Sequence, residues 1–167
     1  EVQSGFGRTG EFFAFQHSRA MPGIVSMAKG MGNGFPVGGI LIHPDIKPRH
    51  GLLGTTFGGN HLACVAALTV LEVLEEEGLI AKTRGLEREF RAGAEGIPGL
   101  KQIRGKGLML GLEMEYEAGG LRKKLLHNHR IFTGSSKNKN QLRILPPLSI
   151  EAEELQLLIS AMKTEGI

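Results

Sequence analysis

The sequence contains no tryptophan, one tyrosine and a single cysteine, Cys64, among 167 residues. A lone cysteine excludes an internal disulfide and is typical of a protein kept in a reducing compartment, so we expect a cytoplasmic location. Cys64 lies in an apolar run, residues 62–68 (LACVAAL). We therefore expect it to be a small buried hydrophobic residue and not a nucleophile.

Long apolar runs and clusters of one charge are also missing. No stretch approaches the roughly 20 apolar residues that a membrane span needs, and we expect no signal peptide. The net charge is +3, and no Lys/Arg run marks a nucleic-acid groove. The six histidines show no metal-ligand spacing. We expect neither a membrane nor a nucleic acid as a partner, and no metal site.

Glycine is abundant, with 25 residues, and its densest cluster follows one lysine. Lys29 ends the apolar stretch 24–28 and precedes residues 30–39 (GMGNGFPVGG). Because a charged amine is costly to bury, a lysine in a tight glycine-rich turn usually has a use for its amine. Three interpretations stay open: a phosphate contact, a Schiff base with a carbonyl compound such as pyridoxal phosphate, or a solvated loop lysine.

Three further segments carry residues suited to chemistry. Residues 5–10 (GFGRTG) match GxGxxG, which indicates a dinucleotide site only within a strand–turn–helix unit and otherwise a structural turn. Residues 54–60 (GTTFGGN) place two hydroxyls ahead of a predicted helix, which suits a phosphate or a simple cap. Arg143 lies in an apolar strand, where its guanidinium needs either a ligand carboxylate or a structural ion-pair partner.

The spacing of apolar residues, glycine and proline predicts two domains, residues 1–77 and 78–167. In the first we expect a short helix, a buried strand and a long helix, at 12–17, 37–42 and 61–77. The second has a small α+β pattern. Its predicted helices are 80–95, 121–129 and 151–163, and its predicted strands are 100–104, 108–115 and 141–145.

Taken together and in this order, four segments resemble the class III (ornithine-type) aminotransferases. They are residues 1–10 (EVQSGFGRTG), 28–39 (AKGMGNGFPVGG), 54–60 (GTTFGGN) and 142–148 (LRILPPL). The resemblance covers essentially the whole chain. It implies an α/β fold, in which this chain is part of the large domain of a fold type I pyridoxal-phosphate transferase plus a small α+β C-terminal domain.

The family pattern implies a role for four residues. Lys29 would form the Schiff base with pyridoxal 5'-phosphate and later move a proton, and Gln3 would hydrogen-bond the phenolic oxygen of the cofactor. Thr56 would bind the phosphate of the cofactor held by a partner subunit, so that a homodimer would share its active sites. Arg143 would bind the α-carboxylate of the amino acid or of 2-oxoglutarate.

The resemblance also implies a reaction. Residues 10–16 and 132–134 are most similar to members that move the δ-amino group of N-acetylornithine or N-succinylornithine to 2-oxoglutarate, a step of arginine biosynthesis. Members that act on ornithine or γ-aminobutyrate share the same four segments and remain an alternative.

Some parts of the family pattern lie outside the sequence. The family aspartate that pairs with the pyridine nitrogen directly precedes the residue that matches Glu1, and the main phosphate loop and a stacking aromatic come earlier still. We therefore expect the chain to be the C-terminal half of a longer protein and to be inactive alone. A non-catalytic folding or dimerisation module is a second hypothesis.

Overall fold

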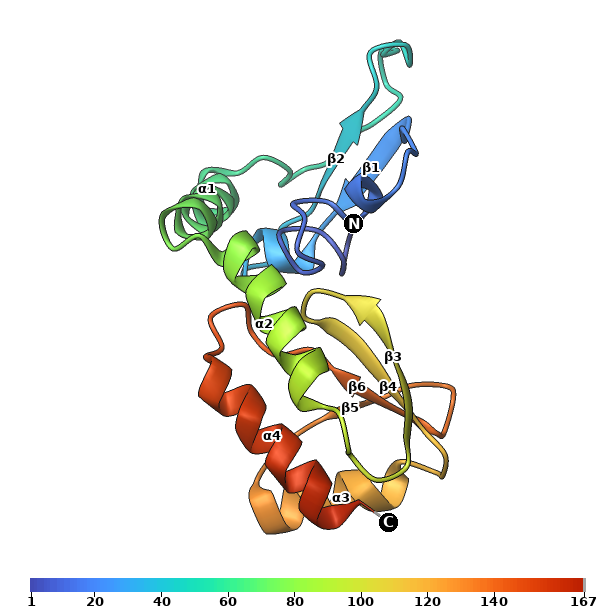
Figure 1. Cartoon of the computed structure of the whole chain (residues 1–167). Helices are drawn as coiled ribbons and strands as arrows, with labels where there is room; N and C mark the ends of the chain where they lie inside the picture. The colour runs from blue at the N-terminus through green and yellow to red at the C-terminus, as the bar shows by residue number, and fades with distance from the viewer. Residues whose placement is uncertain (167) are drawn as a thin grey trace. The chain divides into compact units, whose positions relative to one another are not determined.

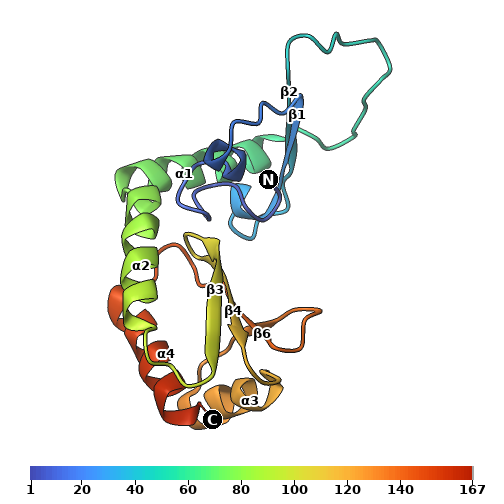
Figure 2. The ribbon, with the colours of Figure 1, turned by 45° about the vertical axis from the view of Figure 1, so that its right-hand side comes forward.

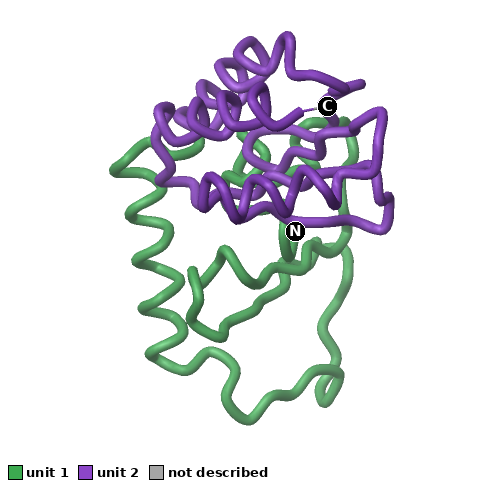
Figure 3. Tube along the Cα trace, turned by 90° about the horizontal axis from the view of Figure 1, so that it is seen from below, with its two compact units in different colours: residues 1–80 green, residues 81–167 purple. Residues whose placement is uncertain are grey.

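The computed structural model describes residues 1–166. Its backbone divides into two compact units, Glu1–Ile80 and Ala81–Ile167 (Figures 1 and 3). The helix α2 (Leu79–Gly93) begins in the first unit and continues into the second. The domain boundary expected between residues 77 and 78 stays a prediction.

The first unit is built from short elements joined by glycine-rich turns. Strands β1 (Ile24–Met27) and β2 (Gly39–Ile42) pair antiparallel and lie side by side in Figure 2. A long connection leads from β2 to the only α-helix that lies wholly in this unit. The remaining elements are the 3-10 helices η1 (Ala14–His17) and η2 (Lys29–Met31) and the helix α1 (His61–Glu76).

Helix α1 begins and ends as the sequence predicts. The Asn60 side chain accepts a hydrogen bond from the Ala63 backbone N–H (3.0 Å), which is the usual N-cap arrangement. At the other end Gly78 has a left-handed backbone (φ 59°), which glycine adopts without a steric penalty. Ala63, Ala67 and Leu74 form the buried face of the helix.

Two predictions about burial in this unit are wrong. Strand β2 was expected to be buried, but its residues Ile40, Leu41 and Ile42 are exposed. Cys64 was expected to be buried, but it too is exposed. The physical reason is that apolar composition shows which side chains avoid water, while burial needs a second layer, and residues 1–166 provide none over these faces.

The second unit is a small antiparallel sheet with three helices packed against it (Figure 1). The order of the strands across the sheet is β3-β4-β6-β5, and all neighbouring strands are antiparallel. The strands are β3 (Leu100–Lys106), β4 (Met109–Met114), β5 (Gly134–Ser135) and β6 (Gln141–Ile144); the helices besides α2 are α3 (Gly119–His129) and α4 (Ala152–Glu165). Every element predicted in this region is present, and only the short β5 was missed.

A continuous apolar core joins the sheet to the helices of this unit. Helix α4 contributes the face that its spacing predicts, with Leu155, Leu158, Ile159 and Met162 all buried. The full cluster is Leu86, Phe90, Ala94, Ile97, Leu108, Leu110, Leu112, Met114, Ala118, Leu121, Leu125, Leu142, Ile144, Leu155, Leu158, Ile159, Ala161 and Met162. Burying one Leu or Ile side chain contributes about 1.5–3 kcal/mol, so this cluster is the main source of stability in the second unit.

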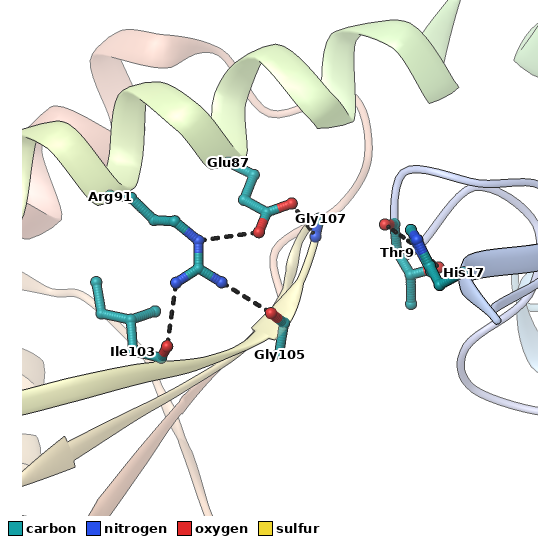
Figure 4. A network of polar contacts seen from close by, with 7 residues as sticks. All are labelled: Thr9, His17, Glu87, Arg91, Ile103, Gly105 and Gly107. Carbon is teal, nitrogen blue, oxygen red and sulfur yellow. Dashed lines mark hydrogen bonds and ion pairs between the residues drawn. The ribbon is translucent and has the colours of Figure 1, made fainter.

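A polar network ties α2 to the β3–β4 hairpin (Figure 4). The Glu87 carboxylate accepts hydrogen bonds from Arg91 Nε (2.9 Å) and from the Gly107 backbone N–H (2.5 Å). Arg91 donates with its other nitrogens to the carbonyls of Ile103 (3.0 Å) and Gly105 (2.7 Å). One ion pair therefore satisfies three backbone groups of the hairpin and fixes its position on the helix.

Candidate active site

Lys29 lies one residue after strand β1 and begins the short helix η2. Its backbone is left-handed (φ 48°), which costs a non-glycine residue about 1–2 kcal/mol. The turn holds this conformation, because the Lys29 carbonyl accepts hydrogen bonds from the backbone N–H groups of Gly32 and Asn33 (both 3.1 Å). Lys29 is exposed, and within residues 1–166 no hydrogen bond or ion pair engages its amine.

The glycines after Lys29 allow a tight reversal of the chain between the two strands. A Cβ added to Gly32 would lie 2.6 Å from the Phe35 carbonyl oxygen and would also meet the Val37 side chain. The backbone therefore passes where no side chain fits. The turn also lies against the N-terminal segment, since a Cβ on Gly30 would be 3.6 Å from the Phe6 side chain.

Gln3 lies in a closed turn of that N-terminal segment. The Gly5 backbone N–H donates to the Glu1 carbonyl (3.1 Å), and the Ser4 hydroxyl donates to the Glu1 carboxylate (2.8 Å). Gln3 itself is exposed, and its amide makes no hydrogen bond in the described part of the chain. The amide is therefore available to a ligand, while the backbone around it is held.

The GxGxxG segment does not have the structure of a dinucleotide site. Residues 5–10 form turns, and the next helical element is the four-residue η1, not an α-helix. The Phe6 ring packs against the rings of Phe12 and Phe13, with centroids 5.3 and 6.3 Å apart. His17 Nε2 lies 3.0 Å from the Thr9 carbonyl oxygen, which closes the loop (Figure 4). The segment is a structural turn.

Thr56 lies in the exposed loop that precedes helix α1. The neighbouring Thr55 hydroxyl accepts a hydrogen bond from the Gly58 backbone N–H (3.1 Å) and so shapes the turn. Within residues 1–166 the Thr56 hydroxyl has no hydrogen-bond partner, so it is free to contact an anion.

Arg143 lies in strand β6, between the buried residues Leu142 and Ile144. The residue is half-buried, and its guanidinium makes one long hydrogen bond, from Nη1 to the Ser135 carbonyl (3.4 Å). No carboxylate pairs with it among the described residues, so the interpretation as a structural ion pair finds no partner there. A bidentate ligand carboxylate remains the partner that suits this guanidinium.

The structure groups three of these residues in one unit. Lys29, Gln3 and Thr56 belong to the first unit and Arg143 to the second. Within residues 1–166 no three His, Cys, Asp or Glu side chains gather in a way that could hold a metal ion. Of the helices described, none is both long and apolar enough to cross a membrane.

The sequence model of the family "Aminotransferase class-III" matches residues 1–165. This chain belongs to the class III aminotransferases. The acetylornithine aminotransferase of Methanocaldococcus jannaschii is 40% identical to it over 97% of this chain and 42% of the relative. This class III chain therefore spans well under half of that relative's length.

Solved structures agree with the family and with the predicted α/β fold. The acetylornithine aminotransferase of Elizabethkingia anophelis matches with a TM-score of 0.84 and 28% identity over 99% of this chain and 44% of that one. An ornithine aminotransferase of Toxoplasma gondii matches with a TM-score of 0.83 and 29% identity over 99% of this chain and 41% of that one. The latter, crystallised with oxidised glutathione, has partial occupancy of PLP at its active site.

Three side chains of this chain carry groups that suit pyridoxal phosphate, the cofactor of the class III aminotransferases. The cofactor presents an aldehyde, a phenolic oxygen and a phosphate. An amine, an amide and a hydroxyl are the groups that suit these three, and Lys29, Gln3 and Thr56 offer them without a competing partner in the described chain.

One residue of this region, Glu1, has a structural part that the sequence pattern does not indicate. Its carboxylate accepts hydrogen bonds from the backbone N–H groups of Ala14 (3.0 Å) and Phe15 (3.1 Å). Burial raises the pKa of the Glu1 carboxyl, but the hydrogen bonds from Ala14, Ser4 and Phe15 outweigh it and hold the pKa below its usual value. No local pattern could have revealed partners so far along the chain.

Proposed function

We propose that the protein containing this chain is a pyridoxal-phosphate-dependent aminotransferase that moves the δ-amino group of N-acetylornithine or N-succinylornithine to 2-oxoglutarate. The observation that carries the proposal is Lys29, an exposed and unengaged amine on a left-handed backbone in the turn that matches the family. Strained backbone conformations concentrate at functional sites. The names of the acetylornithine aminotransferases among its relatives support this class of amino donor.

When bound, pyridoxal phosphate supplies an electron sink for the carbon that loses its proton. Lys29 would hold the cofactor through Nζ and, once the substrate amine has displaced it, its free amine would move the proton at the amine-bearing carbon of the substrate. Gln3 donates its amide N–H to the phenolic oxygen and so holds the ring orientation. Arg143 holds the α-carboxylate of the substrate with two parallel hydrogen bonds.

The proposal includes a homodimer in which Thr56 contacts the phosphate of the cofactor held by the other subunit. Support comes from the unengaged Thr56 hydroxyl and from the apolar face of α1 that follows the same loop. Leu62, Val65 and Leu68 on that face are 71, 61 and 55% exposed. Exposed apolar patches of this kind mark protein–protein contacts. We also propose a cytoplasmic location, on the single cysteine.

A second candidate is a non-catalytic folding or dimerisation module formed by this chain alone. The observation that favours it is the same apolar surface of the first unit, which would associate whether or not a cofactor is bound. Stoichiometric binding of pyridoxal phosphate by the 167 residues, at one reactive lysine, would contradict it.

The principal test replaces Lys29 in the protein encoded by the complete reading frame that contains these residues. Lys29→Ala should abolish the visible absorbance of the bound cofactor and lower kcat by roughly 10⁴-fold or more. The matched control is Lys47→Ala, the other lysine of the first unit, whose amine bonds only to the Pro44 carbonyl. Persistence of both absorbance and turnover in Lys29→Ala would refute the assignment.

The amino donor is settled by a substrate panel on the same protein. We expect kcat/KM to be highest for N-acetylornithine or N-succinylornithine, with ornithine and γ-aminobutyrate well below. A preference for either of the last two would replace the proposed donor and leave the role of Lys29 intact.

A further inference from the structure

The Glu1 carboxylate joins two segments of the first unit. Oε2 accepts hydrogen bonds from the Ser4 hydroxyl (2.8 Å) and the Ala14 backbone N–H (3.0 Å), and Oε1 accepts from the Phe15 N–H (3.1 Å). Hydrogen bonds to an ionised carboxylate are stronger than those between neutral groups. Both oxygens of Glu1 are therefore used to hold residues 1–5 against residues 14–15.

Gln3 lies within the turn that Glu1 closes. The turn is also closed by the bond from the Gly5 N–H to the Glu1 carbonyl (3.1 Å), and a Cβ on Gly5 would meet that carbonyl oxygen at 2.9 Å and the Phe13 ring at 3.4 Å. The backbone on both sides of Gln3 is thus packed and bonded. Its own amide has no partner among residues 1–166, so the backbone of the turn is what restricts the region that the amide can reach.

The same segment contacts the turn that carries Lys29. Gly30 lies against the Phe6 side chain: a Cβ added to Gly30 would be 3.6 Å from the Phe6 Cβ. A shift of residues 1–5 would therefore change the position of Gln3 relative to Lys29. Misplacement of a hydrogen-bond donor by about 1 Å is enough to lose most of its effect.

We propose that Glu1 is a positioning residue for Gln3: its carboxylate fastens the turn of residues 1–5 to Ala14 and Phe15 and so sets the Gln3 amide for its contact with the cofactor. This inference rests on the proposed function, in which Gln3 donates to the phenolic oxygen of pyridoxal phosphate. Glu1 itself acts only through the turn and is not a catalytic residue.

The test is a double-mutant cycle in the complete protein, with the dissociation constant of pyridoxal phosphate as the readout. Gln3→Ala and Glu1→Ala should each weaken binding about tenfold, and Glu1→Ala should add almost nothing when Gln3 is already alanine. Equal losses in the two backgrounds would overturn the inference, because Glu1 would then act independently of Gln3. Glu89→Ala, which removes an exposed carboxylate on α2, is the matched control and should leave binding unchanged.

A second measurement reports on the contact without using activity. Hydrogen–deuterium exchange at the Ala14 and Phe15 amides should rise in Glu1→Ala and rise less in Glu1→Gln, which keeps one acceptor oxygen. Glu1→Gln also replaces Glu1→Ala in the cycle if the alanine variant does not fold. Unchanged exchange in both variants would overturn the proposed clamp.

Failure of the proposed function would look different. Absorbance of a bound imine and turnover that both survive Lys29→Ala would refute that function and, with it, any role for Gln3. Lys29-dependent binding in which Glu1 and Gln3 are additive would refute only the role of Glu1.

Discussion

The two units bury their apolar residues to very different degrees. In the second unit a single core cluster runs through the sheet and all its helices. Among the described residues, every large exposed hydrophobic side chain lies in the first unit except Leu126, Phe132 and Leu157. Unit two therefore has the packing of a complete small domain, while unit one has apolar faces that residues 1–166 leave uncovered.

The elements of the first unit explain the difference. Its sheet has only two strands, and an isolated two-stranded sheet is marginally stable in water. Helix α1 buries one face through Ala63, Ala67 and Leu74 and leaves a second apolar face outward. An apolar side chain on an uncovered face contributes no burial energy, so the unit is held by turns, caps and hydrogen bonds more than by a core.

The largest expected effect comes from separating the units. Residues 78–167, which keep helix α2 whole, should unfold cooperatively on heating, because they contain the entire core cluster. Residues 1–77 should show no cooperative transition and should aggregate, because of their exposed apolar faces. Circular dichroism melts and size-exclusion chromatography of the two pieces decide the matter. A cooperative melt of monomeric residues 1–77 would show that the first unit has a sufficient core of its own.

A pair of matched leucine substitutions probes the same contrast. Leu112→Ala, which removes a side chain with no exposure, should lower the free energy of unfolding by about 2–5 kcal/mol. Leu62→Ala on the exposed face of α1 should change it by about 0.5 kcal/mol or less in the 167-residue monomer. Urea denaturation of both variants measures the difference. Similar losses would mean that the α1 face is covered in solution.

The α2–hairpin network offers a smaller effect. Arg91→Ala removes donors to Ile103 and Gly105 and leaves the partly buried Glu87 carboxylate with one partner fewer. We expect a loss of about 1–3 kcal/mol in unfolding free energy. Arg88 lies on the same helix but is exposed and takes no part in this network. Arg88→Ala is therefore the control and should have little effect on the unfolding free energy. Equal effects would show that the network adds nothing to stability.

The smallest effect is a pH dependence in the second unit. Hydrogen bonds from Asn128 and then His129 are the main causes that lower the pKa of Glu165, and the Lys124 and His129 charges add to them. A lowered pKa in the folded state stabilises the fold above the unfolded pKa of about 4.3, and this contribution is lost as pH falls through the folded value. In residues 78–167, Glu165→Gln should therefore make the free energy of unfolding fall less steeply as the pH is lowered through the acid range; denaturant unfolding at several pH values measures this. If the variant loses stability at acid pH as steeply as the unmodified chain, other carboxylates cause the acid sensitivity.

Much of the local structure followed from the sequence because local signals decide it. Asn60 and Gly78 mark the ends of α1, and the spacing of Leu155, Leu158 and Ile159 marks the buried face of α4. The site residues came from a different source. The roles expected for Lys29, Gln3, Thr56 and Arg143 rest on the family pattern, and the structure adds their local geometry.

The network contacts were beyond sequence reasoning. Glu1 bonds to Ala14 and Phe15, and Arg91 bonds to backbone carbonyls of a hairpin, and neither pairing has a repeating spacing. In hydrogen bonds of this kind the partner is a backbone group, which almost every residue type carries, so the identity of the partner residue gives no signal. Their existence depends on where two separate segments come to lie, which no single-segment pattern encodes.

The sequence by itself determined most of the elements, the caps, the glycine turns and the apolar faces of this protein, because each depends on residues within a turn or two of one another. Tertiary structure alone decided which of those faces are buried. Cys64 and strand β2 have the composition of a core, yet they are exposed because no layer within residues 1–166 packs on them. Burial is a property of two surfaces in contact, and a sequence pattern describes only one of them.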